Sequence, residues 1–99
     1  MAIDMTKPLT LAGEPMTVQQ SFYTHGGGIA LVVVASDGIP FLTLTTNIAA
    51  ARLLPGEFCV KVWSENEPYV ADILASGRFE DTGKRIAAGF AEAHVWRMR

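Results

Sequence analysis

The chain has 99 residues, of which 49% are hydrophobic and 18% are charged, and its formal net charge is −2. This length fits one domain with a real core, and the composition excludes a disordered chain, which would be polar and rich in charge. Nucleic-acid binding is not expected, because phosphate contacts need clustered basic residues and the eight Lys and Arg residues are scattered. The apolar excess is typical of a protein that hides one face in a homodimer.

The cysteine content and the hydropathy of the chain bear on its location. Cys59 is the only cysteine, which argues against a secreted scaffold held by internal disulfides. The N-terminal residues lack the basic start and apolar run of a signal peptide. The longest strongly apolar stretch, residues 29–35, is far shorter than the roughly 20 residues that span a bilayer. We therefore expect a cytoplasmic protein without a membrane anchor.

Strand patterns alternate with turn signals along most of the chain. The expected strands are residues 9–11, 16–23, 29–35, 40–46, 57–63, 84–88 and 91–98. Residues 29–35 are rich in valine and do not alternate, which predicts a central strand covered on both faces. Asp37-Gly38 predicts a tight hairpin, because both of these residue types tolerate positive φ. Residues 1–8 are expected to be a flexible leader, so that the domain occupies residues 1–99 as a single unit.

One main helix is expected at residues 64–77. Ser64 and Glu67 have the spacing of a capping box, and Gly77 suits a left-handed C-terminal cap. Alternatively, Asn66 or Glu67 caps the helix and leaves Pro68 in its first turn, where proline is accepted. The apolar stripe that would pack on a sheet consists of Val70, Ile73 and Leu74. Hairpin connections then predict an α+β domain with a mostly antiparallel, curved sheet of about five to six strands and this helix packed on one face.

The remaining segments are expected to be turns. Asn47 is a good helix N-cap, and the alanines that follow favour either a single helical turn or a tight loop over residues 47–54. Residues 79–83 read as a polar turn, and Gly89 is expected to be the hinge of the last hairpin. Gly26–Gly28 leads into a strand, whereas phosphate-binding loops lead into a helix, so we interpret it as a hairpin connection.

Few residues in the chain could support catalysis or hold a metal. His25, Cys59 and His94 lack the spacing of metal ligands, so no metal and no cofactor are expected. Cys59 lies in a strand pattern, which favours a buried and inert thiol. We therefore predict that the protein is not an enzyme. A ligand-binding or enzymatic domain that uses Cys59 with His94, or the carboxylates near the helix, is one alternative, and a weak nucleic-acid binder is another.

Aromatic and acidic residues flank the predicted helix. Exposed aromatic residues anchor many protein interfaces, although Trp63 and Tyr69 would equally suit the edge of the core. Acidic residues near a helix N-terminus are also favoured by the helix dipole alone. The residues predicted to contact another protein are Trp63, Glu65, Asn66, Glu67, Tyr69, Glu80 and Asp81. Whether these residues form an interface or merely cap the helix stays open at this point.

Several motifs between residues 16 and 98 are similar to those of one family. They are Gly-Ile-Ala-Leu (28–31), Asp-Gly-x-Pro (37–40), Leu-Thr-x-Asn (44–47), Leu-Pro-Gly (54–56), Val-Lys-x-x-Ser-Glu-Asn-Glu (60–67) and Phe-Glu-Asp-Thr-Gly (79–83). In these motifs the chain resembles a small family of uncharacterised bacterial proteins common on plasmids, prophages and other mobile elements. Small proteins of such elements often bind another protein to disable host defences. The resemblance implies a small protein-binding inhibitor or regulator, such as an anti-CRISPR-like protein.

Overall fold

The computed structural model describes residues 9–49 and 51–99, so the predicted leader lies outside the described residues. The elements are β1 (Leu9–Leu11), β2 (Glu14–Phe22), β3 (Ile29–Ala35), β4 (Pro40–Thr43), β5 (Glu57–Val60), the 3-10 helix η1 (Ser64–Tyr69), α1 (Val70–Ala75), β6 (Phe79–Ala88) and β7 (Ala91–Met98). All strand pairs are antiparallel. The predicted α+β class is therefore confirmed.

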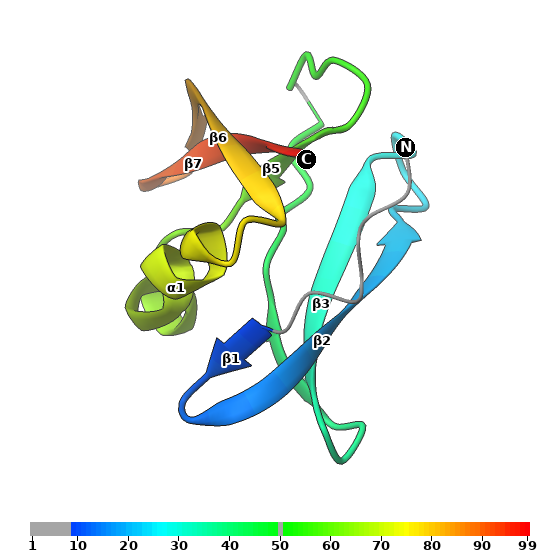
Figure 1. The fold of residues 1–99 in the computed structure, drawn as a ribbon. Helices are drawn as coiled ribbons and strands as arrows, with labels where there is room; N and C mark the ends of the chain where they lie inside the picture. The colour runs from blue at the N-terminus through cyan, green and yellow to red at the C-terminus, as the bar shows by residue number, and fades with distance from the viewer. Residues whose placement is uncertain (1–8, 50) are drawn as a thin grey trace.

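The strands form two sheets rather than one. The four-stranded sheet has the order β1-β2-β3-β4 and the three-stranded sheet has the order β5-β7-β6 (Figure 1). The prediction of a single curved sheet of five to six strands is wrong. Sequence patterns locate strands but carry no information on where a long strand bends away from its neighbours.

The chain after β4 connects the two sheets. Leu44 donates its N–H to the carbonyl of Leu31 in one sheet and accepts a hydrogen bond from Lys61 N, just beyond the other, both at 2.9 Å. The next residue, Thr45, makes an isolated antiparallel bridge with Val60 of β5. The strand predicted at residues 40–46 is therefore shortened to β4, and its second half serves as the hinge between the sheets.

One hydrophobic core fills the space between the sheets and the helix. Its buried members are Leu9, Leu11, Met16, Val18, Leu31, Val33, Leu42, Leu44, Phe58, Val60, Ile73, Phe79 and Trp96. The rings of Phe58 and Phe79 pack edge to face with centroids 5.4 Å apart, and Trp96 lies 6.2 Å from Phe79. Burial of each large side chain stabilises the fold by roughly 1.5–3 kcal/mol. The prediction that Trp96 belongs to the core is confirmed.

The helical segment begins differently from its prediction. Ser64 has φ 59°, Trp63 occupies the N-cap position, and no side-chain cap is formed, so the predicted capping box is wrong. Pro68 lacks the N–H that an α-helical ladder would use, and the first turns are a 3-10 helix. The predicted apolar stripe is confirmed, because Ile73 is fully buried and its two companions pack against the core.

The segment predicted as a polar turn at residues 79–83 is the first half of β6. Phe79 is 1% exposed and anchors this strand in the core, which outweighs the turn propensity of the four residues after it. A register shift between Asp81 and Arg85 forms a bulge that accommodates Gly83, whose φ is 85°. The final hairpin hinged at Gly89 is confirmed.

The β3–β4 hairpin also differs in detail. Gly38 has φ 86°, whereas Asp37 is not among the described residues with positive φ. Gly38 N donates to Ala35 O at 2.9 Å, and the Asp37 carboxylate accepts from Ile39 N at 3.0 Å. The hairpin predicted at Asp37-Gly38 is therefore confirmed, and of the two residues that tolerate positive φ only the glycine adopts it.

Candidate functional site

Asn66, predicted as a partner contact, lies inside the fold. Its side chain is fully buried, and Nδ2 donates to Thr43 O at 2.8 Å and to Lys61 O at 2.9 Å. Thr43 ends β4 of one sheet and Lys61 follows β5 of the other, so the Asn66 amide connects η1 to both sheets. The prediction for Asn66 is corrected accordingly, because a buried amide cannot contact a partner.

The two aromatic residues of the predicted interface are partly buried. The ring of Tyr69 packs edge-on against Phe41 of β4, with centroids 5.0 Å apart and planes inclined by 72°. Trp63 lies at the N-cap of η1 and is also partly exposed. Tyr69 therefore helps to hold the helical segment on the edge of the four-stranded sheet, and only part of each ring is free to contact another molecule.

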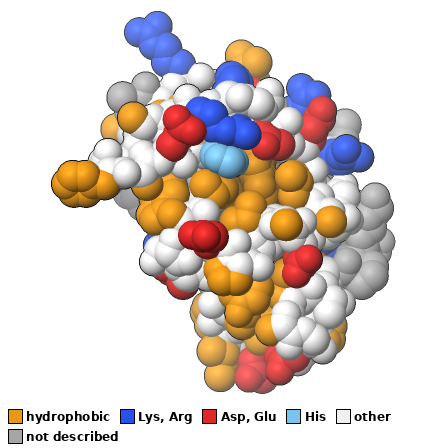
Figure 2. All heavy atoms as spheres, turned by 90° about the vertical axis from the view of Figure 1, so that its left-hand side faces the viewer, with side chains coloured by type: hydrophobic (Ala, Val, Ile, Leu, Met, Phe, Trp, Pro, Cys, Tyr) orange, Lys and Arg blue, Asp and Glu red, His pale blue; other side chains and the backbone are white. Residues whose placement is uncertain are grey.

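The predicted acidic residues do not form one acidic surface. Three of them pair with cations of the same chain: Glu65 with Lys61 at 2.7 Å, Glu80 with Arg97 at 2.8 Å, and Asp81 with Arg85 at 2.9 Å. Glu67 is exposed. On the side formed by β6, β7 and the helix, opposite charges lie next to one another around a histidine (Figure 2). Glu80 and Asp81 are neighbours in one strand, so their side chains face opposite sides of the sheet.

These pairings shift the acid equilibria of two carboxylates. The hydrogen bonds from Lys61 and Ser64 lower the pKa of Glu65 to about 2. The hydrogen bond from Arg85 lowers the pKa of Asp81. Both groups therefore stay ionised over the physiological range and are unsuited to donating a proton in acid–base catalysis.

Cys59 and His94 are not brought together. Cys59 is opposite Val95 in the β5–β7 register and His94 is opposite Val60, so the two side chains lie on different faces of the sheet. Cys59 is buried, and its burial, followed by the charge of Glu57, raises the pKa of its thiol. Within residues 9–49 and 51–99, no group of three or more His, Cys, Asp or Glu side chains could hold a metal ion.

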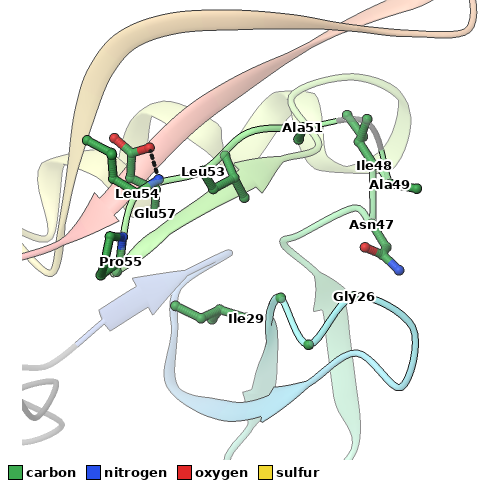
Figure 3. A pocket seen from close by; sticks show the side chains of 13 residues that line it. Gly26, Ile29, Asn47, Ile48, Ala49, Ala51, Leu53, Leu54, Pro55 and Glu57 are labelled. Atoms are coloured by element: carbon green, nitrogen blue, oxygen red, sulfur yellow. Dashed lines mark hydrogen bonds between the residues drawn. The ribbon is translucent and has the colours of Figure 1, made fainter.

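A hollow of about 400 Å³ lies between the β2–β3 turn and the segment after β4 (Figure 3). One wall consists of the backbone of Gly26–Gly28 and the side chain of Ile29, and the other is formed by residues 47–49, Ala51 and residues 53–57. Asn47 connects the two walls, because its Nδ2 donates to His25 O at 3.1 Å. Asn47 thus cross-links two loops rather than capping a helix, and residues 47–49 and 51–54 form a loop.

Glu57 is the buried charged group in the wall of this hollow. Its Oε1 accepts from Lys84 Nζ at 2.6 Å and from Leu54 N at 2.9 Å, and the residue is 6% exposed. Burial alone would raise the pKa of Glu57, but these hydrogen bonds and the charges of Lys84 and Arg97 outweigh it and lower the pKa. The carboxylate is therefore charged at neutral pH and fixes the loop at Leu54.

A second hollow of about 360 Å³ lies on the other side of the same loop. Residues 51–53 separate it from the first hollow, and its floor includes Ile86 and Val95 of the three-stranded sheet. Lys84 and Arg85 of β6 line it together with Arg52. The Lys84–Glu57 ion pair thus joins the two hollows beneath the loop.

Large apolar side chains surround the first hollow at the surface. Ile29 lines the hollow. Phe22, which is 64% exposed, pairs with Ile29 across β2 and β3, so its side chain lies on the same face of the sheet, next to the lining residues rather than among them. Leu54, also 64% exposed, lines the opposite wall beside Pro55. We call Phe22, Ile29, Leu54 and Pro55 the cavity mouth. The sequence contained one signal for it, the apolar Leu53-Leu54-Pro55 run within a loop, but no pattern indicates that this run lies across a hollow from the start of β3.

Scans of this chain against family models, curated proteins and solved structures each returned no match. Among the helices of the described residues, none combines the length and the hydropathy that crossing a bilayer requires. The candidate site is therefore defined by the geometry of the described residues.

Proposed function

We propose that this protein is a small non-enzymatic binding protein that inhibits or regulates another protein, and that the partner docks on the cavity mouth. The supporting observation is that exposed Leu54 lines a hollow large enough to accept a side chain, and that exposed Phe22 lies opposite Ile29 of the other wall. Exposed apolar residues grouped around a hollow are typical of protein-binding surfaces. Covering the two side chains would contribute about 1–2 kcal/mol each.

The motifs that carry the family resemblance support the same location. Gly28 and Ile29 belong to one of these motifs, Asn47 ends another, and Leu54–Gly56 is a third, and all of them line the hollow. We therefore propose that the protein acts in the setting that the resemblance implies, as an anti-defence or plasmid-maintenance factor of a mobile element. The chemistry of the mouth favours a partner with a protruding apolar side chain.

Affinity capture with matched variants tests this proposal. The tagged protein should recover a stoichiometric partner from lysate of a bacterial host that carries a defence system, and Phe22→Ser combined with Leu54→Ser should abolish recovery. Ile39→Ser is the control, because Ile39 is also 64% exposed but lies beyond the opposite end of β3. Equal recovery by the double variant, or the absence of any partner, would count against the proposal.

A second candidate function is binding of a small ligand in the hollow itself. Glu57 favours it, because this buried carboxylate lines the hollow beside apolar side chains. A ligand with an amine or amide N–H and an apolar body would match the carboxylate and the apolar wall. Titration of small amines by NMR should then shift Gly26–Gly28 and Glu57, and Glu57→Gln should weaken the effect.

A further inference from the structure

The outer edge of β6 carries unused backbone hydrogen-bonding groups. β6 is the last strand in the order β5-β7-β6, and no described strand pairs with its outer side. The β6–β7 hairpin points away from the four-stranded sheet (Figure 1). A free strand edge is a template for pairing with another strand, so the groups that it presents need to be identified.

The register of the hairpin identifies these groups. Ala88 and Ala91 pair across the two-residue turn at Gly89 and Phe90. The residues that close such a turn exchange hydrogen bonds, and bonded and non-bonded pairs then alternate along the ladder. Arg85 and Ala87 fall on non-bonded positions, so their N–H and C=O groups point away from β7.

Charged residues often protect strand edges from pairing, but here the charges are neutralised within the chain. Lys84 pairs with Glu57 at 2.6 Å and Arg85 pairs with Asp81 at 2.9 Å. The bulge between Asp81 and Arg85 limits regular pairing to the segment Lys84–Ala88. At the end of this segment, Phe90 is fully exposed on the turn. The edge is therefore short, without net repulsion and flanked by an apolar side chain.

We propose that the segment Lys84–Ala88 pairs antiparallel with the same segment of a second copy, about a two-fold axis at Ile86. Arg85 then lies opposite Ala87 of the second copy, and the outward groups of these residues form a closed set of N–H···O bonds. The alternative register with Arg85 opposite itself places like charges together and is disfavoured. The chosen register also brings Phe90 beside Thr82 of the second copy. Such an interface is self-complementary, as two-fold symmetry requires.

The occupant is a second copy rather than an unrelated strand, because the segment Lys84–Ala88 is complementary to itself in hydrogen-bonding groups and in side chains. Its outward donors meet its own outward acceptors, its apolar Ile86 meets itself, and its cation faces a small residue. The three-stranded sheets of the two copies would then form one continuous sheet. This proposal does not depend on the cavity mouth or on its partner.

Sedimentation equilibrium over a range of protein concentrations tests the dimer. Ala87→Pro removes the outward N–H, and proline is tolerated on an edge strand where its missing N–H faces solvent. Because two hydrogen bonds are lost per dimer, the dissociation constant should rise by roughly tenfold or more. Ala87→Ser keeps the N–H and should still dimerise, and circular dichroism verifies that all variants are folded.

Cysteine cross-linking tests the register in a Cys59→Ser background. Opposed residues in a non-bonded antiparallel pair have Cα atoms about 4.5 Å apart, which suits a disulfide. Ile86→Cys should therefore form a covalent dimer on mild oxidation, while Ala88→Cys, which faces Lys84 of the second copy, should not. A monomer at every concentration, a dimer unaffected by Ala87→Pro, or equal cross-linking of both cysteine variants would overturn the proposal.

Discussion

Replacing Asn66 tests whether the segment Ser64–Tyr69 is an interface or a structural clamp. In Asn66→Ala, two buried hydrogen bonds to Thr43 O and Lys61 O are lost. Each bond contributes about 0.5–1.5 kcal/mol, and a carbonyl left buried without a partner adds about 1–3 kcal/mol. Allowing for partial access of water to the two carbonyls, we expect the free energy of unfolding to fall by about 2–4 kcal/mol. A domain of this size has only about 5–15 kcal/mol in total.

Urea denaturation followed by circular dichroism measures this loss. Asn66→Asp should be more destabilising than Asn66→Ala. The Asp carboxylate would place an oxygen where Nδ2 donates now, and this oxygen would be repelled by the carbonyl oxygens of Thr43 and Lys61. Glu67→Ala is the control; it removes an exposed side chain next in sequence and should change stability by less than about 0.5 kcal/mol. If Asn66→Ala were as stable as the wild type, the inference that the Asn66 hydrogen bonds stabilise the fold would be refuted. A role for Asn66 in contacting a partner would then be favoured again.

Two further predictions concern titratable groups. The pKa of Glu57 is lowered in the folded chain from its usual 4.5. The ionised carboxylate therefore adds to the free energy of unfolding above pH 4.5, and this stabilisation is lost as the pH falls below that value. The free energy of unfolding, measured by urea denaturation at pH 7 and pH 3, should therefore decline less in Glu57→Gln than in the wild type; equal declines would contradict the assignment. The buried Cys59 thiol has a raised pKa and should react with a thiol reagent at least about a hundredfold more slowly in the native protein than in urea; equal rates would show that the strand is exposed.

Local patterns were sufficient to predict most strands of this fold. The valine-rich run at residues 29–35 coincides with β3, and alternation located β2 to within a few residues. The helix stripe was also correct, because Ile73 and its companions repeat at the period of a helix that covers a core. These signals arise because one face of a strand or helix packs on the core, and the residues of that face recur at the period of the element.

The errors occurred where distant contacts decide the local conformation. Phe79 opens a segment of turn-forming residues, yet its ring is held between Phe58 and Trp96 and draws the segment into β6. Ser64 and Glu67 had the spacing of a capping box, but the side chain that fastens this turn is Asn66, through carbonyls of Thr43 and Lys61. No local pattern encodes a bond between residues 23 positions apart.

The candidate site was missed for the same reason. The cavity mouth combines Phe22, at the end of β2, with Leu54, in a loop that a buried carboxylate holds in place. In the sequence these residues belong to a strand and a turn that share no motif. The pairing of Phe22 with Ile29 sets Phe22 beside one wall of the hollow, and the bond from Leu54 N to Glu57 holds Leu54 in the other wall.

The two proposed surfaces use different groups, and this separates their tests. Partner binding at the cavity mouth depends on the side chains of Phe22 and Leu54, whereas self-association depends on backbone groups of Arg85 and Ala87. Lys84 connects them, since it lies in β6 and bonds to Glu57 in the wall of the hollow. Substitutions at Ala87 leave that ion pair intact, so a dimer lost in Ala87→Pro with an unchanged partner would show that the protein binds its target without the second copy.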